Sequence, residues 1–291
     1  MKIKLICIFV LIFLCKSCKN KSEKNNDEEN KVVDTETVVN FNEIISDYNT
    51  WWSYHYHKIN LSSDFIPVDS NSKIIDKSSF LENLTSGNYI TIELKTNDSI
   101  PKYKLFELPK DIPDPIKTTI KSTSAVTYNY HQMEGLNFPE FNFSDINGNE
   151  YKNEQLKGKI TVLKTWFIAC VPCVKEFPEL NNLVDKYSNN ENVQFISLAT
   201  DTKQPLNSFL EKKEFKYTVV PNQKEFIEQK IKSKIYPTHI IVDDKGVIIK
   251  VMNRASHMIA YLKSITDLTE SQTKKKLAPP PPPPMPNKND V

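Results

Sequence analysis

The stretch "WFIACVPCVKEFPEL" (residues 166–180) places two cysteines, Cys170 and Cys173, two residues apart. Apolar side chains follow them at helical spacing, and the near-continuous apolar run "ITVLKTWF" (160–167) precedes them. The first pattern predicts an α-helix and the second a buried central β-strand, so the cysteines are expected where the strand turns into the helix. A cysteine pair at such a place can bind a metal, carry a haem, staple the fold or exchange electrons.

Three of these four uses fit the sequence poorly. Haem attachment requires C-x-x-C-H, and Val174 stands where the histidine is needed. A structural zinc site requires a second pair of Cys or His at short spacing, which the chain lacks, and His239 offers only one distant extra ligand. A disulfide between Cys170 and Cys173 would close too short a loop to stabilise the fold much. The pattern therefore favours electron exchange, with the redox-active cysteine pair in place of a cofactor and no metal.

The beginning of the chain is typical of an exported protein. Two lysines precede an apolar run at 5–14, and a run of about ten residues is too short to span a bilayer but suits a secretory signal. Ser17 and Cys18 then resemble the lipobox of bacterial lipoproteins, in which the cysteine is lipidated, although Cys15 stands where such boxes usually carry Leu. We therefore expect a lipoprotein signal peptide at 1–17 and a membrane anchor on Cys18. A signal peptide cut elsewhere and an uncleaved anchor remain the alternatives.

Export would leave few thiols in the mature chain. Of the five cysteines, two would leave with the signal and Cys18 would carry lipid, so that only Cys170 and Cys173 remain. The expected location is the cell envelope, lipid-anchored and facing the periplasm, with display at the cell surface left open. An oxidising compartment permits disulfides, yet no structural one can be drawn apart from this pair. The formal net charge of +2 and the five glycines favour neither a nucleic-acid partner nor a phosphate-binding glycine loop.

Composition divides the mature chain into four parts. Residues 18–40 are charged and poor in apolar side chains, which predicts a solvated tether, and residues 41–133 predict a small β-rich domain. Residues 136–268 alternate strand-like and helix-like segments, which predicts an α/β fold. Residues 269–291 are predicted to form a disordered Lys/Pro-rich tail, because a polyproline run stays extended.

The β-rich assignment depends on two segments rich in aromatic and β-branched residues. They are "WWSYHYHKINL" (51–61) and "NYITIELK" (88–95), whose alternation predicts strands. His55 and His57 would then share one strand face. Because no Cys, Asp or Glu stands at ligand spacing beside them, packing or surface roles are favoured over a metal site.

Four features follow one another in the α/β part: Trp166 ahead of the cysteines, the C-x-P-C pair itself, Pro178 after it, and Tyr236-Pro237-Thr238 followed by "IIVDDKG". Together they resemble the TlpA/ResA-like thiol–disulfide oxidoreductases, a thioredoxin-fold family. The resemblance covers less than half of the chain, and it implies a central mixed β-sheet flanked by helices and a cis peptide bond before Pro237. Copper carriers of the same fold have three residues between their cysteines, whereas this chain has two. Peroxiredoxins need P-x-x-x-T-x-x-C, and no proline precedes Thr165 at that spacing.

The resemblance also implies roles for individual residues. Cys170, at the N-terminus of a helix whose dipole lowers the thiol pKa, would stay accessible and attack the substrate disulfide. Cys173 would resolve the resulting mixed disulfide. The remaining positions follow the family motif: Trp166, Pro172 and Pro237 in the catalytic site, and Tyr236 and Thr238 in the substrate groove.

Two further residues are candidates for the catalytic chemistry. Lys164 occupies a position that is often an acid in thioredoxin and commonly Asn in the periplasmic relatives. Its charge could stabilise a Cys173 thiolate, but a lysine that covers apolar surface and keeps its head in water is the favoured interpretation. Glu176, three residues after Cys173, could shuttle protons, although an exposed helix carboxylate is favoured.

These features predict a membrane-tethered periplasmic thiol–disulfide oxidoreductase that reduces protein disulfides. The C-x-P-C spacer resembles the reducing branch of the fold, so a membrane electron donor of the DsbD/CcdA type is the expected partner. A disulfide isomerase is one alternative. A lipoprotein whose N-terminal domain captures a partner is another, with the redox domain in a minor role.

Overall fold

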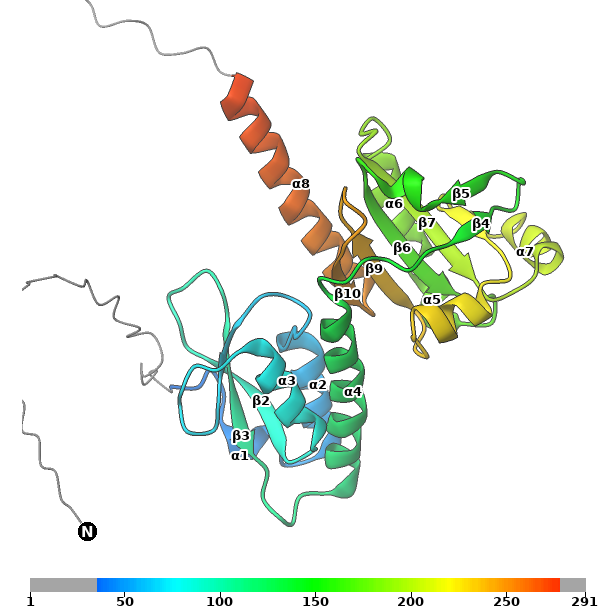
Figure 1. Cartoon of the computed structure of the whole chain (residues 1–291). Coiled ribbons are helices and arrows are strands. Elements are labelled where there is room, and N and C mark those ends of the chain that lie inside the picture. Colours follow the sequence, from blue (N-terminus) through cyan, green and yellow to red (C-terminus); the bar gives the residue numbers. More distant parts are fainter. Residues whose placement is uncertain (1–35, 278–291) are drawn as a thin grey trace, which may run out of the picture.

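The computed structural model of this chain describes residues 36–277, with side chains described up to Asp267. The expected signal peptide, Cys18 and residues 278–291 lie outside that range. Within it, no helix combines the length and the apolar character needed to cross a membrane. Figure 1 shows an N-terminal and a C-terminal region, which helix α4 (Asp114–Met133) joins.

The N-terminal region is a small sheet covered by helices. Its strands lie in the order β1-β3-β2, with β1 parallel and β2 antiparallel to β3. The elements before α4 are α1 (Phe41–Ile44), α2 (Tyr48–Lys58), β1 (Ile66–Val68), α3 (Lys77–Thr85), β2 (Tyr89–Leu94) and β3 (Lys102–Glu107). The strand predicted at 88–95 is present as β2. The prediction of a β-rich domain is wrong, because most of the regular structure of this region is helical.

The error lies in the segment 51–61, most of which belongs to helix α2 and not to a strand. Asp47 caps this helix, since its carboxylate accepts the backbone N–H groups of Asn49 and Thr50. Trp51 is buried and anchors the helix in the core. Aromatic residues as dense as these satisfy both the alternation of a strand and the i, i+3, i+4 spacing of a helix, and the cap decides between the two.

His55 and His57 do not share a face, because residues two apart on a helix point in different directions. His55 stacks on Trp51 and Trp52, with ring centroids 5.5 and 5.9 Å apart, whereas His57 is exposed. Burial, followed by the positive charge of Arg254, lowers the pKa of His55 to about 4. His55 thus has the packing role that the sequence favoured, on a helix and not on a strand.

Backbone pairing begins earlier than the predicted tether allows. Val38 donates its N–H to the Glu93 carbonyl at 3.1 Å, and Lys95 donates its N–H to the Glu36 carbonyl at 2.8 Å. These residues pair alongside β2, so the tether predicted at 18–40 is too long at its C-terminal end.

A five-stranded mixed sheet forms the centre of the C-terminal region, in the order β10-β9-β6-β7-β8. Strands β6, β7 and β8 are parallel, and β9 is antiparallel to both of its neighbours. The strands are β6 (Ile160–Trp166), β7 (Val193–Ala199), β8 (Thr218–Val220), β9 (Thr238–Val242) and β10 (Ile248–Met252), preceded by the hairpin β4 (Asn142–Ser144) and β5 (Glu150–Lys152). The helices are η1 (Asn153–Leu156), α5 (Val171–Lys175), α6 (Phe177–Lys186), α7 (Lys203–Leu210), η2 (Phe226–Lys230) and α8 (Ala255–Leu277). The predicted α/β class, with a central mixed sheet flanked by helices, is confirmed.

Helix α8 is longer than predicted. It begins at Ala255 and ends at Leu277, so its backbone continues past residue 268. The prediction that the disordered Lys/Pro-rich tail starts at residue 269 is therefore wrong. Lysine is a good helix former, and the proline run that must end a helix begins only at Pro279.

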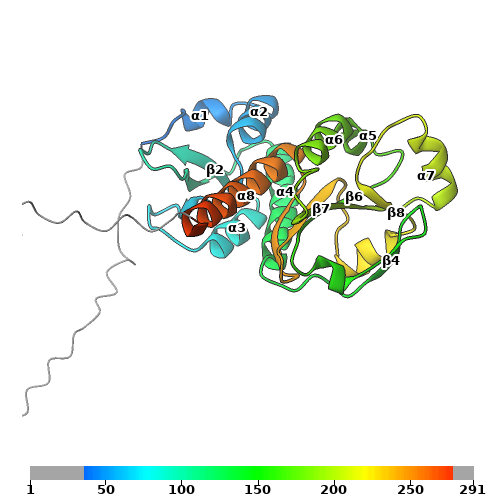
Figure 2. The ribbon, with the colours of Figure 1, turned by 90° about the horizontal axis from the view of Figure 1, so that it is seen from above.

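Helix α4 belongs to two cores. Ile116 and Ile120 pack in the core of the N-terminal region. Val126, Tyr130 and Met133, further along the same helix, pack against the core of the C-terminal sheet. Both views place α4 between the two regions (Figure 1 and Figure 2). A shared helix, and not a flexible linker, therefore sets the position of one region against the other.

Candidate active site

The cysteine pair lies where the sequence predicted, at the turn from β6 into α5. Cys170 is the N-cap of α5, and its sulfur accepts the backbone N–H of Cys173 at 3.3 Å. The two cysteines form a disulfide with Cα atoms 5.2 Å apart. Pro172 occupies the first turn, where its missing N–H costs no helical hydrogen bond. Cys170 is 5 % exposed and Cys173 is fully buried, so Cys170 is the outer cysteine but is less accessible than predicted.

Trp166 forms the apolar base of the site. It is fully buried at the end of β6, and its ring meets the rings of Phe177 and Phe215 edge-on, with centroids 5.0 and 5.7 Å apart. Phe177 and Phe215 in turn stack at 3.9 Å. The same apolar cluster contains Cys170 and Cys173. Trp166 thus provides a rigid aromatic support that keeps water away from the inner sulfur.

Pro178 divides the helix after the cysteines. A proline lacks the N–H that would bond the carbonyl four residues earlier, so α5 ends at Lys175 and α6 begins at Phe177. Glu176 lies at this break, and its side chain reaches the central sheet.

On the sheet, Glu176 meets two buried basic side chains. Its Oε2 pairs with Lys164 Nζ and lies 3.1 Å from His239 Nε2, while its Oε1 accepts the Ala255 N–H at 3.0 Å. Lys164 and His239 are register partners on β6 and β9, so both project from the same face. Both are fully buried, and the Glu176 side chain is 15 % exposed. The interpretations of Lys164 as a lysine with its head in water and of Glu176 as an exposed carboxylate are wrong, because each finds its counter-charge inside the protein.

This cluster has a defined charge state. Burial raises the pKa of Glu176, but the hydrogen bond from His239 and the Lys164 ammonium outweigh it and hold that pKa at about 2. Burial lowers the pKa of Lys164 against the attraction of Glu176, and burial together with the Lys164 charge lowers the pKa of His239. Lys164 and Glu176 therefore form an ion pair, beside an imidazole whose lowered pKa favours its neutral form.

His239, which the sequence left open as a distant metal ligand, is engaged in this cluster. Its Nε2 contacts Glu176, and its Nδ1 has no hydrogen-bond partner among the described residues. Within residues 36–267, no group of three or more His, Cys, Asp or Glu side chains could hold a metal ion. The sequence gives only the position of His239, two residues after Pro237, and the structure adds that its strand pairs with the strand of Lys164.

The loop before β9 packs against the apolar cluster of the disulfide. Its Tyr236–Pro237 peptide bond is cis, as the resemblance implied. The Tyr236 ring meets Phe167 edge-on at 5.3 Å and joins the apolar cluster that contains both cysteines. Thr238 is fully buried and shares a hydrogen bond of 2.8 Å with the Tyr130 hydroxyl of α4. Thr238 therefore supports the loop from inside, and its predicted place in the groove is wrong.

A cleft of about 650 Å³ opens beside the cysteine helix, between the two regions. Pro172, Tyr236 and Pro237 line it from the C-terminal region, and helices α2 and α4 line it from the N-terminal region. The predicted groove position of Tyr236 agrees with this lining. No sequence pattern predicted the contribution of α2 and α4.

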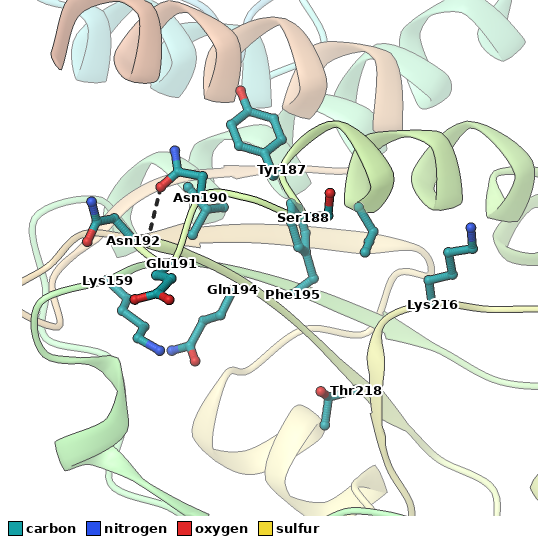
Figure 3. A pocket seen from close by; sticks show the side chains of 12 residues that line it. Lys159, Tyr187, Ser188, Asn190, Glu191, Asn192, Gln194, Phe195, Lys216 and Thr218 are labelled. Atoms are coloured by element: carbon teal, nitrogen blue, oxygen red, sulfur yellow. Dashed lines mark hydrogen bonds between the residues drawn. The ribbon is translucent and has the colours of Figure 1, made fainter. Parts of the chain in front are cut away.

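A second cavity, of about 480 Å³, lies where the parallel strands of the sheet begin. Figure 3 shows the side chains that line it. Lys159, Asn190 and Asn192 line it near the points where the chain enters β6 and β7. In Figure 3 the Asn192 backbone N–H donates to the Asn190 side chain at 3.1 Å. Because the cysteines follow the other end of β6, this cavity is separate from the redox site.

The C-terminal region has recognisable relatives. Residues 135–251 match the model of the AhpC/TSA family. This segment is similar to the thiol-disulfide oxidoreductase ResA of Bacillus cereus, with 29 % identity over 136 residues, 45 % of this chain and 78 % of the relative. ResA of Bacillus subtilis is 27 % identical over 120 residues, 41 % of this chain and 66 % of the relative.

Solved structures are similar over the same share of the chain. The thioredoxin domain of a thiol-disulfide oxidoreductase from Bacteroides vulgatus has 20 % identity and a TM-score of 0.42, and the match covers 45 % of this chain and 96 % of that one. A thiol-disulfide oxidoreductase from Bacteroides fragilis has 18 % identity and a TM-score of 0.42, with 45 % and 99 % covered.

The AhpC/TSA segment of this chain is a ResA/TlpA-like thiol–disulfide oxidoreductase domain, and the prediction from the cysteine motif is confirmed. The structure brings together Trp166, Cys170, Pro172 and Cys173 at one end of β6. The family model begins after α4, so the N-terminal region lies outside it.

Proposed function

We propose that this protein is a reductase of protein disulfides, tethered to the membrane through Cys18 and facing the periplasm. The carrying observation is the Cys170–Cys173 disulfide at the N-terminus of α5, with Pro172 and the cis Pro237 loop on one cleft. Free N–H groups and the macrodipole at a helix N-terminus stabilise a thiolate there. In the reduced protein, Cys170 is thus placed to attack another disulfide as a thiolate.

In the reducing direction, the reaction begins from the dithiol form. The Cys170 thiolate attacks one sulfur of the substrate disulfide, which forms a mixed disulfide and releases the other substrate sulfur as a thiolate. The Cys173 thiolate then attacks the Cys170 sulfur, which forms the Cys170–Cys173 disulfide and releases the second substrate sulfur. The substrate gains two electrons and two protons, and the cysteine pair loses them.

Lys164, Glu176 and His239 act in this proposal as positioning residues. Lys164 lies two residues before Trp166 on β6, and Trp166 packs with Cys173. In this proposal the charge of Lys164 favours the thiolate form of the inner cysteine. Glu176 holds the ammonium in place, and His239 holds Glu176. Repeated turnover further requires a donor that returns two electrons to the disulfide. A membrane dithiol donor of the DsbD/CcdA type supplies that chemistry to a protein held at the membrane.

The reduction potential of the Cys170/Cys173 pair tests the direction of the reaction. We expect a value near roughly −270 mV, where thioredoxin works as a reductase. Equilibration against thiol buffers measures it through the fluorescence of Trp166, which packs with both cysteines. The Cys170→Ser variant, which has no pair to oxidise, is the control for the signal. A potential near roughly −180 to −120 mV would instead make the protein an isomerase or an oxidase.

Attachment through Cys18 has a separate test. Cys18 lies outside the described residues, so the lipobox-like sequence supports this part of the proposal. We expect a Cys18→Ala variant to lose incorporated radiolabelled palmitate and to move from the membrane fraction to the soluble fraction. Its reduction of insulin should be unchanged, because the redox site is untouched. Cys15→Ala is the matched control and should keep the label. A Cys18→Ala protein that stayed in the membrane would point to an uncleaved anchor.

A further inference from the structure

The cleft beside the cysteine helix has two walls from different parts of the chain. Pro172 and the cis-proline loop form one wall. Trp52 and Tyr56 of α2, together with Thr127 of α4, belong to the other. A polypeptide bound at the disulfide and extending into the cleft would therefore contact the N-terminal region as well.

Direct bonds hold the second wall in place. Arg254, just before α8, donates to the Tyr56 carbonyl at 2.7 Å and lies 4.1 Å from the centroid of the Tyr56 ring. The Tyr130 hydroxyl of α4 shares a hydrogen bond of 2.8 Å with Thr238, the residue after the cis-proline. The N-terminal wall is thus bonded to the same loop and strand ends that build the redox site.

Exposed apolar side chains surround the site. Val171, between the two cysteines, is 64 % exposed, and Ile235, just before the cis-proline loop, is 39 % exposed. Tyr56, on the opposite wall, is 44 % exposed. Large apolar side chains that stay in water around a cleft are typical of a surface that binds another polypeptide.

The charges of the cleft offer little attraction to a strongly charged ligand. Glu176 is paired with Lys164, and Arg254 stacks on an aromatic ring of α2. Burial, with Arg254 close by, lowers the pKa of His55 and of His257 to about 4, so both are neutral at neutral pH. The other charged side chains of the lining are one of each sign, Lys175 and Glu179. The cleft therefore suits a ligand of low net charge.

We propose that the N-terminal region forms half of the substrate site, and that the cleft takes an extended polypeptide segment with apolar side chains beside the attacked cysteine. The inference rests on the proposed function, because Cys170 attacks the disulfide of that segment. A small disulfide needs contact only with Cys170 and its neighbours, whereas about 650 Å³ accommodates several residues of an extended chain. Pro172 lies between the cysteines and lines the cleft, so the segment runs from Cys170 into it.

A bulky side chain on the α4 wall tests the inference. Thr127 lines the cleft and is half-buried, whereas Asn129, two residues later on the same helix, is exposed and is not part of the lining. Thr127→Arg and Asn129→Arg introduce the same side chain and charge into one helix, but only the first obstructs the cleft. The measurement is the second-order rate constant at which a disulfide oxidises the reduced full-length protein.

With insulin as the disulfide, we expect Thr127→Arg to lower this rate constant by about tenfold or more. With hydroxyethyl disulfide, which is small and neutral, the same variant should stay within about twofold of the unsubstituted protein. Asn129→Arg should change neither rate constant. Ser122→Arg, at another position of the cleft lining, repeats the test if Thr127→Arg does not fold.

Equal rate constants for insulin in Thr127→Arg and Asn129→Arg would overturn the inference. An equal loss with insulin and with hydroxyethyl disulfide would assign the cleft to a small disulfide and would overturn it as well. If the unsubstituted protein reacts with neither disulfide, the proposed function itself fails, and this result is distinct from the other two.

Discussion

Replacing Cys173 by Ala should turn the protein into a trap that accumulates mixed disulfides through Cys170. Cys170 is the outer cysteine and keeps its place at the helix N-terminus, so the attack on a substrate disulfide still occurs. Without the second sulfur, the mixed disulfide is not resolved. Multiple-turnover reduction of insulin should then fall by about a hundredfold or more. Non-reducing electrophoresis followed by mass spectrometry would measure the adducts and identify their partners.

The Cys170→Ser variant is the matched control for this trap. It should be equally inactive but should form few adducts, because Cys173 is fully buried beneath the outer cysteine. Abundant adducts on Cys173 in the Cys170→Ser protein would reverse the assigned roles of the two cysteines. The comparison requires no knowledge of the natural substrate, since the adducts themselves report it.

Replacing Lys164 by Met should lower the free energy of unfolding by roughly 3 kcal/mol at neutral pH. The substitution keeps the volume of the side chain but leaves the Glu176 carboxylate buried without its ammonium partner. The pKa of Glu176 should rise as a result, because burial then acts with less opposition. Lys164→Met/Glu176→Gln removes both charges and should recover most of the lost stability, since a buried ion pair replaced as a whole costs little. Denaturant unfolding of the two variants measures both effects.

The pH dependence of the free energy of unfolding is a second test of the Lys164→Met substitution. The pKa of Glu176 is 4.5 in an ordinary environment and about 2 in the folded protein. Such a depressed carboxyl contributes roughly 3 kcal/mol of stability above pH 4.5, and this contribution is lost as pH falls from 4.5 to 2. The lowered pKa of His239 acts in the same direction, because below pH 6.5 the unfolded imidazole takes up a proton that the folded one refuses.

The stability that is lost as pH falls from 4.5 to 2 should therefore be smaller in Lys164→Met than in the unsubstituted protein. The difference between the two stability curves isolates this group from other carboxylates. Parallel curves, together with unchanged stability at neutral pH, would show that Lys164 and Glu176 are not coupled. Equal reduction potentials of the Cys170/Cys173 pair in the two proteins would remove Lys164 from the redox chemistry.

The redox motif and the sheet around it could be predicted because their signals are local. Buried parallel strands appear as unbroken apolar runs, and Trp166, the cysteines and Pro237 keep a fixed order along the chain. The state of Lys164 could not be predicted in this way. Its partner Glu176 is 12 residues away, and Glu176 in turn meets His239 at a separation of 63 residues. From sequence alone, a single lysine in an apolar strand can either reach solvent with its ammonium group or form a buried ion pair.

The N-terminal region was harder to predict for a different reason. The dense aromatic residues at 51–61 satisfy two periodicities at once, and the deciding signal is Asp47, which lies outside that segment. The dual role of α4 is equally invisible locally, because its apolar residues serve one core in the first half and another in the second. Only the tertiary arrangement shows which half of α4 packs in which core.

Because α4 serves both cores, the residue at which the family segment starts does not separate two folding units. The match begins at residue 135, yet Val126 and Tyr130 precede it and cover part of the sheet core that follows. A piece of chain that started there would expose this apolar surface to water. It would also lose the hydroxyl that bonds Thr238 next to the cis-proline. The segment contains all of the reacting residues, but it lacks the α4 side chains that cover its core. The stability of the redox site therefore depends on both regions together.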